Sequence, residues 1–160
     1  MLPKPDGCRG CPLDGPGSFV PDEIVDSPVF VLGQNPGADE ERAGRPFVGR
    51  SGQELDNKYL PLAGLERGRV SLGNVLRCRW KGTNDLPTGV VLRDAVRHCT
   101  DAHLRIPPAT QLVIAHGALA WKLLNGKLGE ERSISEWRGF LKPELIKVDN
   151  ATGKILDENA

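Results

Sequence analysis

The sequence predicts an α/β protein, a three-layer α/β/α sandwich on a short, about four-stranded parallel sheet with an N-terminal cysteine-anchored loop. Short apolar runs recur along the chain, and polar turns and helical patterns follow them, which is the βα repetition of a parallel sheet. The expected strands are 29–32, 69–72, 112–115 and 145–148. Residues 1–28 are instead rich in proline, glycine and aspartate, and so predict a loop that something other than a core holds in place.

Length and composition limit the number of domains and the classes of binding partner. A chain of 160 residues with 39% hydrophobic and 26% charged residues suits one globular domain, 1–160, whose fold we expect to be incomplete after residue 148. No apolar run is long enough to span a membrane, and the N-terminus lacks the apolar core of a signal peptide, so we expect a cytoplasmic protein without membrane contact. Basic and acidic residues balance at 21 each, so any binding to a polyanion must rest on local patches. Arginines gather at 42, 45 and 50, and again at 77 and 79.

The richest stretch follows the first strand. Gln34 and Asn35 place two carboxamides in a turn at the carboxyl end of that strand, the edge of an open α/β sheet where ligands bind. Phe47 lies between glycines and a proline in a polar segment, which makes it a candidate stacking platform. Ser51 and Glu54 have the spacing of a capping box, which predicts a helix start whose free N–H groups can meet an anion.

The remaining elements follow in order. Pro61 and Gly64 mark the end of the first helix, and Asn74 again places a carboxamide after a strand. Helical spacing over 91–99 places Cys99 on an inward face, and 117–124 predicts the helix after a buried third strand. Residues 137–139 predict a turn. Each histidine has an ordinary interpretation, as surface or cap residues for His98 and His103 and as an incidental residue at the sheet edge for His116.

Four cysteines suggest a metal site. Cys8 and Cys11 form a Cys-x-x-Cys pair in an irregular segment, without the strand and helix of a thioredoxin-type redox pair, and disulfides are disfavoured in the cytosol. With Cys78 and Cys99 they can complete a tetrahedral zinc site or hold a [4Fe–4S] cluster. Spacing alone does not choose between these two, and buried thiols are a third interpretation of Cys78 and Cys99.

Three features together resemble the iron–sulfur uracil-DNA glycosylases, commonly called family 4. The first is Gly-x-x-Pro-Gly-x-x-Glu-Glu-x-x-Gly-x-Pro-Phe-Val-Gly-x-Ser-Gly over 33–52, the second is Asn-Val-Leu-Arg-Cys-Arg over 74–79, and the third is the order of the four cysteines. The resemblance covers residues 8 to about 140 and implies a [4Fe–4S] cluster on Cys8, Cys11, Cys78 and Cys99, with structural zinc as the alternative. The spacing from Cys78 to Cys99 is longer than is usual in the family, so residues 80–90 are expected to carry an insertion.

The same resemblance implies the roles of the site residues. Phe47 would stack on an extruded uracil, and Asn74 would hydrogen-bond the Watson–Crick edge of the base. Backbone N–H groups of the Gln34 turn would stabilise negative charge on uracil O2. Arg50, Ser51 and Gly52 would contact DNA.

The sequence departs from the family pattern at two places. Gln34 replaces the usual glutamate with an amide that cannot act as a base, whereas Asn35 resembles the asparagine that positions water in mismatch-specific and single-strand-selective glycosylases; Glu40 matches another acidic position and is a further catalytic candidate. The family's His-Pro-Ser loop is absent from residues 1–160. Either the chain ends short of that loop or the group has been lost.

The expected function is therefore removal of uracil from single- or double-stranded DNA by a monomeric repair enzyme, which flips the base and hydrolyses its N-glycosidic bond. The alternative is a catalytically impaired, glycosylase-like iron–sulfur domain that binds nucleic acid within a larger replication or repair protein. A more distant alternative is a small-molecule or nucleotide-binding α/β protein with structural zinc.

Overall fold

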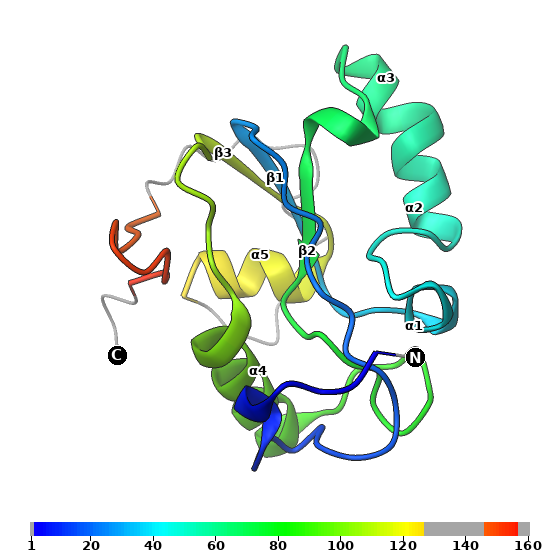
Figure 1. Cartoon of the computed structure of the whole chain (residues 1–160), viewed down its shortest axis with the longest axis vertical. Helices are drawn as coiled ribbons and strands as arrows, with labels where there is room; N and C mark the ends of the chain where they lie inside the picture. The colour runs from blue at the N-terminus through cyan, green and yellow to red at the C-terminus, as the bar shows by residue number, and fades with distance from the viewer. Residues whose placement is uncertain (1, 127–145, 157–160) are drawn as a thin grey trace.

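The computed structural model describes residues 2–126 and 146–156. Its centre is a parallel sheet of β1 (Val29–Gly33), β2 (Ser71–Asn74) and β3 (Leu112–Ala115) in the order β2-β1-β3 (Figure 1). Gly33 pairs in register with Asn74, and Leu32 pairs with Ala115. The carboxyl ends of the three strands therefore meet at one edge, as the βα pattern predicted.

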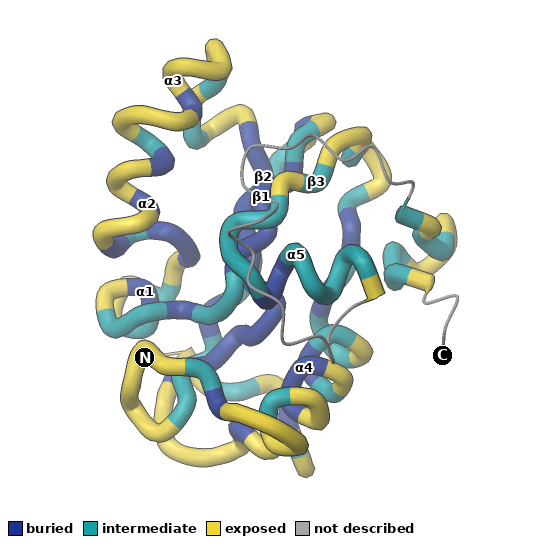
Figure 2. The backbone as a smooth tube through the Cα atoms, turned by 180° about the vertical axis from the view of Figure 1, so that it is seen from behind, coloured by how far each residue is buried: buried dark blue, intermediate teal, exposed yellow. Residues whose placement is uncertain are grey.

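Helices cover both faces of the sheet, which confirms the three-layer sandwich (Figures 1 and 2). One layer holds α1 (Ala38–Ala43), α2 (Arg50–Glu54), the π-helical turn η2 (Leu55–Tyr59) and α3 (Leu60–Leu62). The other holds α4 (Gly89–His103) and α5 (Ala118–Leu124). Short 3₁₀ turns lie at η1 (Asp6–Cys8) and η3 (Arg67–Arg69). None of the described helices is long and apolar enough to cross a membrane.

Alternation along β1 divides the core in two. Phe30 and Leu32 pack with α4 and α5, whereas Val31 packs with Phe47 and Leu55 on the opposite face. Neighbouring residues of a strand point to opposite faces, so a strand buried on both sides reads as a continuous apolar run. That is why 29–32 could be identified from sequence.

Two strand predictions need correction. Within the described residues the sheet has three strands, and the part of 145–148 that is described does not join it, because Val148 forms an antiparallel bridge with Ile155 instead. Leu145 and the predicted turn at 137–139 lie outside the described residues. β3 is also less buried than expected: Leu112 and Ile114, which lie on the same face of the sheet as Val31, are exposed.

The helix that follows the first strand also begins differently. The prediction that Ser51 caps a helix is wrong, because α2 starts at Arg50 after Gly49, which makes Ser51 part of the helix. The acidic segment at 39–41 forms α1, a helix that the sequence did not suggest. Glu40 gives α1 the acidic half of a capping box, since Glu40 Oε2 accepts the Gly37 N–H at 2.9 Å.

Candidate active site and cysteine pocket

A cavity of about 360 Å³ opens at the carboxyl edge of the sheet. Its lining brings together residues that sequence reasoning had placed in one site: Gln34, Asn35, Glu40, Phe47, Arg50, Ser51 and Asn74. Asn84 and His116 also line it. A cavity of this size, with convergent polar groups, is typical of a small-molecule or single-base site.

Phe47 forms a buried aromatic wall of this cavity, and an unusual backbone conformation places it there. Its φ of 54° lies in the left-handed region, which residues other than glycine rarely adopt. Arg67 holds this turn, because its guanidinium donates to the carbonyl oxygens of Phe47 and Pro46 at 2.7 and 2.6 Å. Gly52 packs below, where a Cβ would lie 1.9 Å from the Phe47 carbonyl oxygen.

Asn74 faces the same space from the end of β2. It is only 6% exposed and lines the cavity. A Cβ on Gly33 would lie 2.4 Å from Asn74 Oδ1 and 2.7 Å from the Phe47 ring, so the glycine leaves room for both groups to meet. A side-chain amide that faces a cavity offers a ligand both a hydrogen-bond donor and an acceptor.

Asn35 is oriented by its own amide nitrogen. Nδ2 donates to the carbonyl oxygens of Pro36 and Asn84, each at 3.3 Å. Two carbonyl acceptors require the nitrogen on this side, which leaves the Asn35 carbonyl oxygen available to accept a hydrogen bond.

The side chains of Gln34 and Glu40 both accept hydrogen bonds from backbone N–H groups, which the sequence did not predict. Gln34 Oε1 accepts the Leu119 N–H at 2.9 Å, and the side chain packs against Gly117, where a Cβ would lie 2.6 Å from Gln34 Cγ. The Glu40 carboxylate accepts backbone N–H groups from Gly37, Val48 and Gly49 at 2.9, 2.9 and 2.6 Å. Glu40 thereby fixes the residues that follow Phe47.

At the rim, Arg50 and Ser51 are exposed, whereas Gly52 is buried under Phe47. The Arg50 and Ser51 side chains are therefore accessible from solvent.

His116, which sequence analysis interpreted as an incidental residue, lines the cavity. Its ring meets the Phe47 ring edge-on, with centroids 5.5 Å apart, and burial lowers the pKa of His116. The signal was available, because His116 directly follows β3 at the edge where Gln34 and Asn74 follow their strands. Arg67 and Asn84 were missed because no local pattern links them to Phe47 or Asn35.

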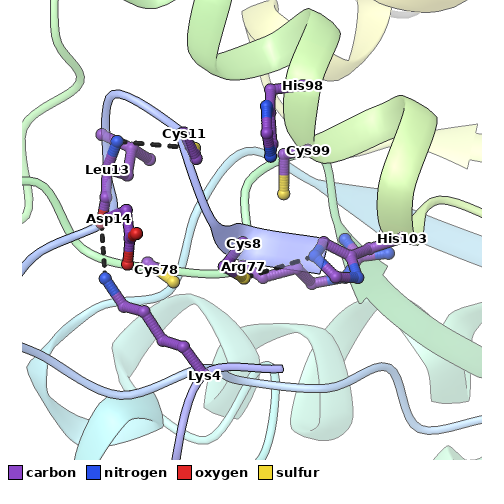
Figure 3. A pocket seen from close by; sticks show the side chains of 10 residues that line it. All are labelled: Lys4, Cys8, Cys11, Leu13, Asp14, Arg77, Cys78, His98, Cys99 and His103. Carbon is purple, nitrogen blue, oxygen red and sulfur yellow. Dashed lines mark hydrogen bonds between the residues drawn. The ribbon is translucent and has the colours of Figure 1, made fainter. Parts of the chain in front are cut away.

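The four cysteines gather in a second pocket, beneath the N-terminal segment (Figure 3). Cys8 and Cys11 come from the N-terminal loop, Cys78 from the segment after β2, and Cys99 from α4. All four are free thiols. Burial raises the pKa of Cys78 to about 12 and that of Cys99 to about 11, so both stay protonated until a metal displaces the proton.

Polar side chains surround these thiols. His103 Nε2 lies 3.3 Å from Cys8 Sγ, and His98 Nε2 donates to the Gly7 carbonyl oxygen at 2.8 Å, so both histidines line the pocket and are more than surface residues. Lys4 and Arg77 add positive charge. Among the described residues, no three cysteine, histidine or acidic side chains lie close enough to hold one metal ion.

The arginines on either side of Cys78 point in different directions. Arg79 forms an ion pair with Glu41 at 2.9 Å on the other side of the segment. Arg77 is 1% exposed and pairs with Asp22 at 2.7 Å. Arg77 therefore cannot contribute to a local patch that binds a polyanion, because a side chain this deeply buried cannot reach a phosphate.

The family model described as the uracil DNA glycosylase superfamily matches residues 21–155, which contain the cavity residues, Cys78 and Cys99 but begin after Cys8 and Cys11. A type-4 uracil-DNA glycosylase of Sulfurisphaera tokodaii is 30% identical over 115 residues, which are 69% of this chain and 50% of that protein. Type-4 uracil-DNA glycosylases of Pyrobaculum aerophilum and Thermotoga maritima are 43% and 36% identical over 74 residues, 45% of this chain and 37% and 38% of theirs. The chain thus spans about half or less of the length of these relatives.

Proposed function

The chain belongs to the uracil DNA glycosylase superfamily, and from this premise we propose that it removes uracil from DNA by hydrolysing the N-glycosidic bond of a flipped nucleotide. The observation that carries the proposal is the cavity in which the Phe47 ring and the Asn74 amide lie together above Gly33. An enzyme that acts on an extruded base needs an aromatic surface for stacking and an amide for its Watson–Crick edge. Both are present at one sheet edge.

Base selection follows from the Asn74 amide. Its oxygen accepts the uracil N3–H, and its NH₂ donates to uracil O4. Cytosine carries an acceptor at N3 and an amino group at position 4, so the same amide cannot make both hydrogen bonds with it in this orientation. Discrimination of this kind depends on buried polar groups that are left unpaired by the wrong base.

Hydrolysis requires a water molecule and a place for negative charge on the departing base. Asn35 presents its carbonyl oxygen to orient the water, since its nitrogen is held by Pro36 and Asn84. Backbone N–H groups of the Gln34 turn stabilise charge on uracil O2, and Gln34 Nε2 keeps its donors because only its oxygen is bound by Leu119. His116, whose lowered pKa keeps it neutral at pH 7, adds an N–H donor to the wall beside Phe47.

Glu40 acts as a positioning residue in this proposal. A carboxylate that already accepts three backbone N–H groups is poorly placed to take a proton from water. Its contribution is to fix Val48 and Gly49, and through them the Phe47 turn. Exposed Arg50 and Ser51 contact the DNA phosphates, and Gly52 contributes by letting α2 approach Phe47.

For the cysteine pocket we propose a [4Fe–4S] cluster bound by Cys8, Cys11, Cys78 and Cys99. Four sulfurs around one zinc ion lie about 3.8 Å apart, since Zn–S bonds are about 2.3 Å and tetrahedral. Thiols that line one pocket without approaching a common point fit the wider spacing of a multi-iron cluster better. When bound, the group supplies a redox-active cross-link between the N-terminal loop, the Cys78 segment and α4.

The test is release of free uracil from an oligonucleotide that contains one uracil, single-stranded or paired with guanine. We expect wild-type protein to release uracil, and Asn74→Asp to bind uracil-containing DNA more weakly and to discriminate less against cytosine. The ionised carboxylate accepts from the cytosine amino group but cannot donate to uracil O4. If wild type and Asn74→Asp discriminate equally between uracil and cytosine, Asn74 does not recognise the base.

The same assay decides between the enzyme and the second candidate, a binding domain of a larger replication or repair protein. The absence of a His-Pro-Ser segment from residues 1–160 favours testing that candidate directly. If the wild type binds uracil-containing DNA with preference over thymine-containing DNA but releases no uracil under single-turnover conditions, the binding domain is the correct function.

The proposed cluster can be tested by the colour and the metal content of the purified protein. Protein purified without oxygen should be brown, with broad charge-transfer absorption near about 400 nm, and should contain iron and acid-labile sulfide. Cys99→Ser should remove the colour and increase proteolysis of residues 2–28, because η1 (Asp6–Cys8) is held mainly through α4. Colourless protein with stoichiometric zinc would refute the cluster.

A further inference from the structure

Arg77 is the most deeply buried charged side chain of the described chain that also lines the cysteine pocket. Its Nη2 donates to Asp22 Oδ2 at 2.7 Å. Its Nη1 is buried and has no hydrogen-bond partner among the described residues. Figure 3 shows the side chain extending from beside Cys8 toward His103.

This arrangement leaves an electrostatic requirement unmet. A guanidinium carries five N–H donors, and a buried donor without an acceptor costs about 1 to 3 kcal/mol, more when the group is charged. Asp22 anchors one branch of the fork. The Arg77 side chain lines the cysteine pocket, so an acceptor in that pocket would satisfy the second branch.

A cluster bound by four thiolates is an anion that offers such acceptors. Its inorganic sulfides and cysteine sulfurs accept hydrogen bonds, and hydrogen bonds to these sulfurs are among the features that set the reduction potential of a cluster. A nearby positive charge favours the more negative, reduced form over the oxidised form.

We propose that Arg77 Nη1 donates a hydrogen bond to a sulfur of the [4Fe–4S] cluster and thereby raises its reduction potential. This inference rests on the proposed cofactor, and it assigns a role to a residue that is neither a ligand nor part of the base cavity. Asp22 fixes the guanidinium so that its second branch stays directed at the pocket. The electron in the redox step moves to the cluster from an external reductant, and no bond is formed or broken.

Arg79 provides a matched control, because it stands on the other side of Cys78 at the same distance in sequence. Its guanidinium donates to Glu41 and Asn84 and does not line the cysteine pocket. Replacing either arginine with methionine therefore changes the net charge close to Cys78, whereas only replacement of Arg77 removes a possible hydrogen bond to the cluster.

The experiment is a redox titration of anaerobically purified protein with dithionite and, for the oxidative couple, ferricyanide, followed by absorbance and electron paramagnetic resonance. For Arg77→Met we expect the ratio of reduced to oxidised cluster at a fixed potential to fall about tenfold, equal to a shift of about −59 mV for a one-electron couple. Arg77→Lys should shift in the same direction by less, since one ammonium keeps the charge but cannot replace the fork. Arg79→Met should titrate as wild type.

Folding of each variant is checked by circular dichroism. A folded Arg77→Met that titrates as wild type overturns the proposal, and so does an equal shift in Arg79→Met. If Arg77→Met does not fold, Arg77→Lys decides, because the proposal requires the potential of that variant to fall, and an unchanged potential overturns it. Wild-type protein without iron and sulfide would overturn the cofactor and this inference together, whereas iron-loaded protein with unshifted Arg77 variants overturns this inference alone.

Discussion

Replacing Asn35 with alanine is expected to lower the rate of uracil release by about 10²-fold or more, the usual cost of losing one group that orients or stabilises a reacting centre. The Asn35 oxygen is the free end of an amide whose nitrogen is held by Pro36 and Asn84. Alanine removes the water-orienting oxygen. Arg50, Ser51 and the base-recognising Asn74 remain, so DNA binding should be nearly unchanged.

The measurement is single-turnover release of uracil from a single-stranded oligonucleotide, with binding followed separately by fluorescence anisotropy. Asn57→Ala serves as control, since Asn57 is exposed on η2 and does not line the cavity. An Asn35→Ala variant as fast as wild type would assign water activation to another group.

A methyl group on Gly52 should damage both stability and base binding. The added Cβ would lie 1.9 Å from the Phe47 carbonyl oxygen and 2.7 Å from its Cα, so backbone atoms must move. Overpacking of this kind costs about 1 to 3 kcal/mol of folding free energy, and the movement is expected to tilt the Phe47 ring, on which we propose that the base stacks. We expect a lower denaturation midpoint and markedly weaker binding of uracil-containing DNA.

The control is Gly68→Ala in η3, where the added Cβ has no neighbour within 4 Å. Denaturant unfolding and anisotropy report the two effects independently. If Gly52→Ala and Gly68→Ala have the same denaturation midpoint and the same affinity for DNA, the close approach of α2 to Phe47 contributes to neither stability nor binding.

Local pattern was sufficient for features that local chemistry determines. A continuous apolar run marked β1, a carboxamide after a strand marked Asn74, and a phenylalanine among glycines and proline marked Phe47. The parallel-sheet rule then brought these residues to one edge, and the cavity there confirms that they meet.

Local pattern failed where a partner is distant in the chain. In the local sequence Arg77 resembles a surface arginine. It is buried with Asp22, which lies 55 residues earlier in the chain and pairs with its guanidinium. Glu40 and Arg67 likewise acquire their roles only when the Phe47 turn folds against them. Ser51 shows the opposite error: a good capping sequence did not set the helix start, because the N-cap is Gly49, two residues earlier, and Gly52 lets α2 pack closely against Phe47.

The Phe47 turn has a consequence for how binding energy is distributed. A left-handed conformation at a bulky residue costs of the order of 1 kcal/mol or more, and it persists because Glu40 and Arg67 hold the flanking backbone from opposite sides. The free-energy cost of the strained backbone at Phe47, and of ordering its side chain, is therefore offset by folding interactions before any nucleotide binds. A flipped base meets a preorganised surface, so the free energy of stacking is available to oppose the loss of its neighbours in the DNA.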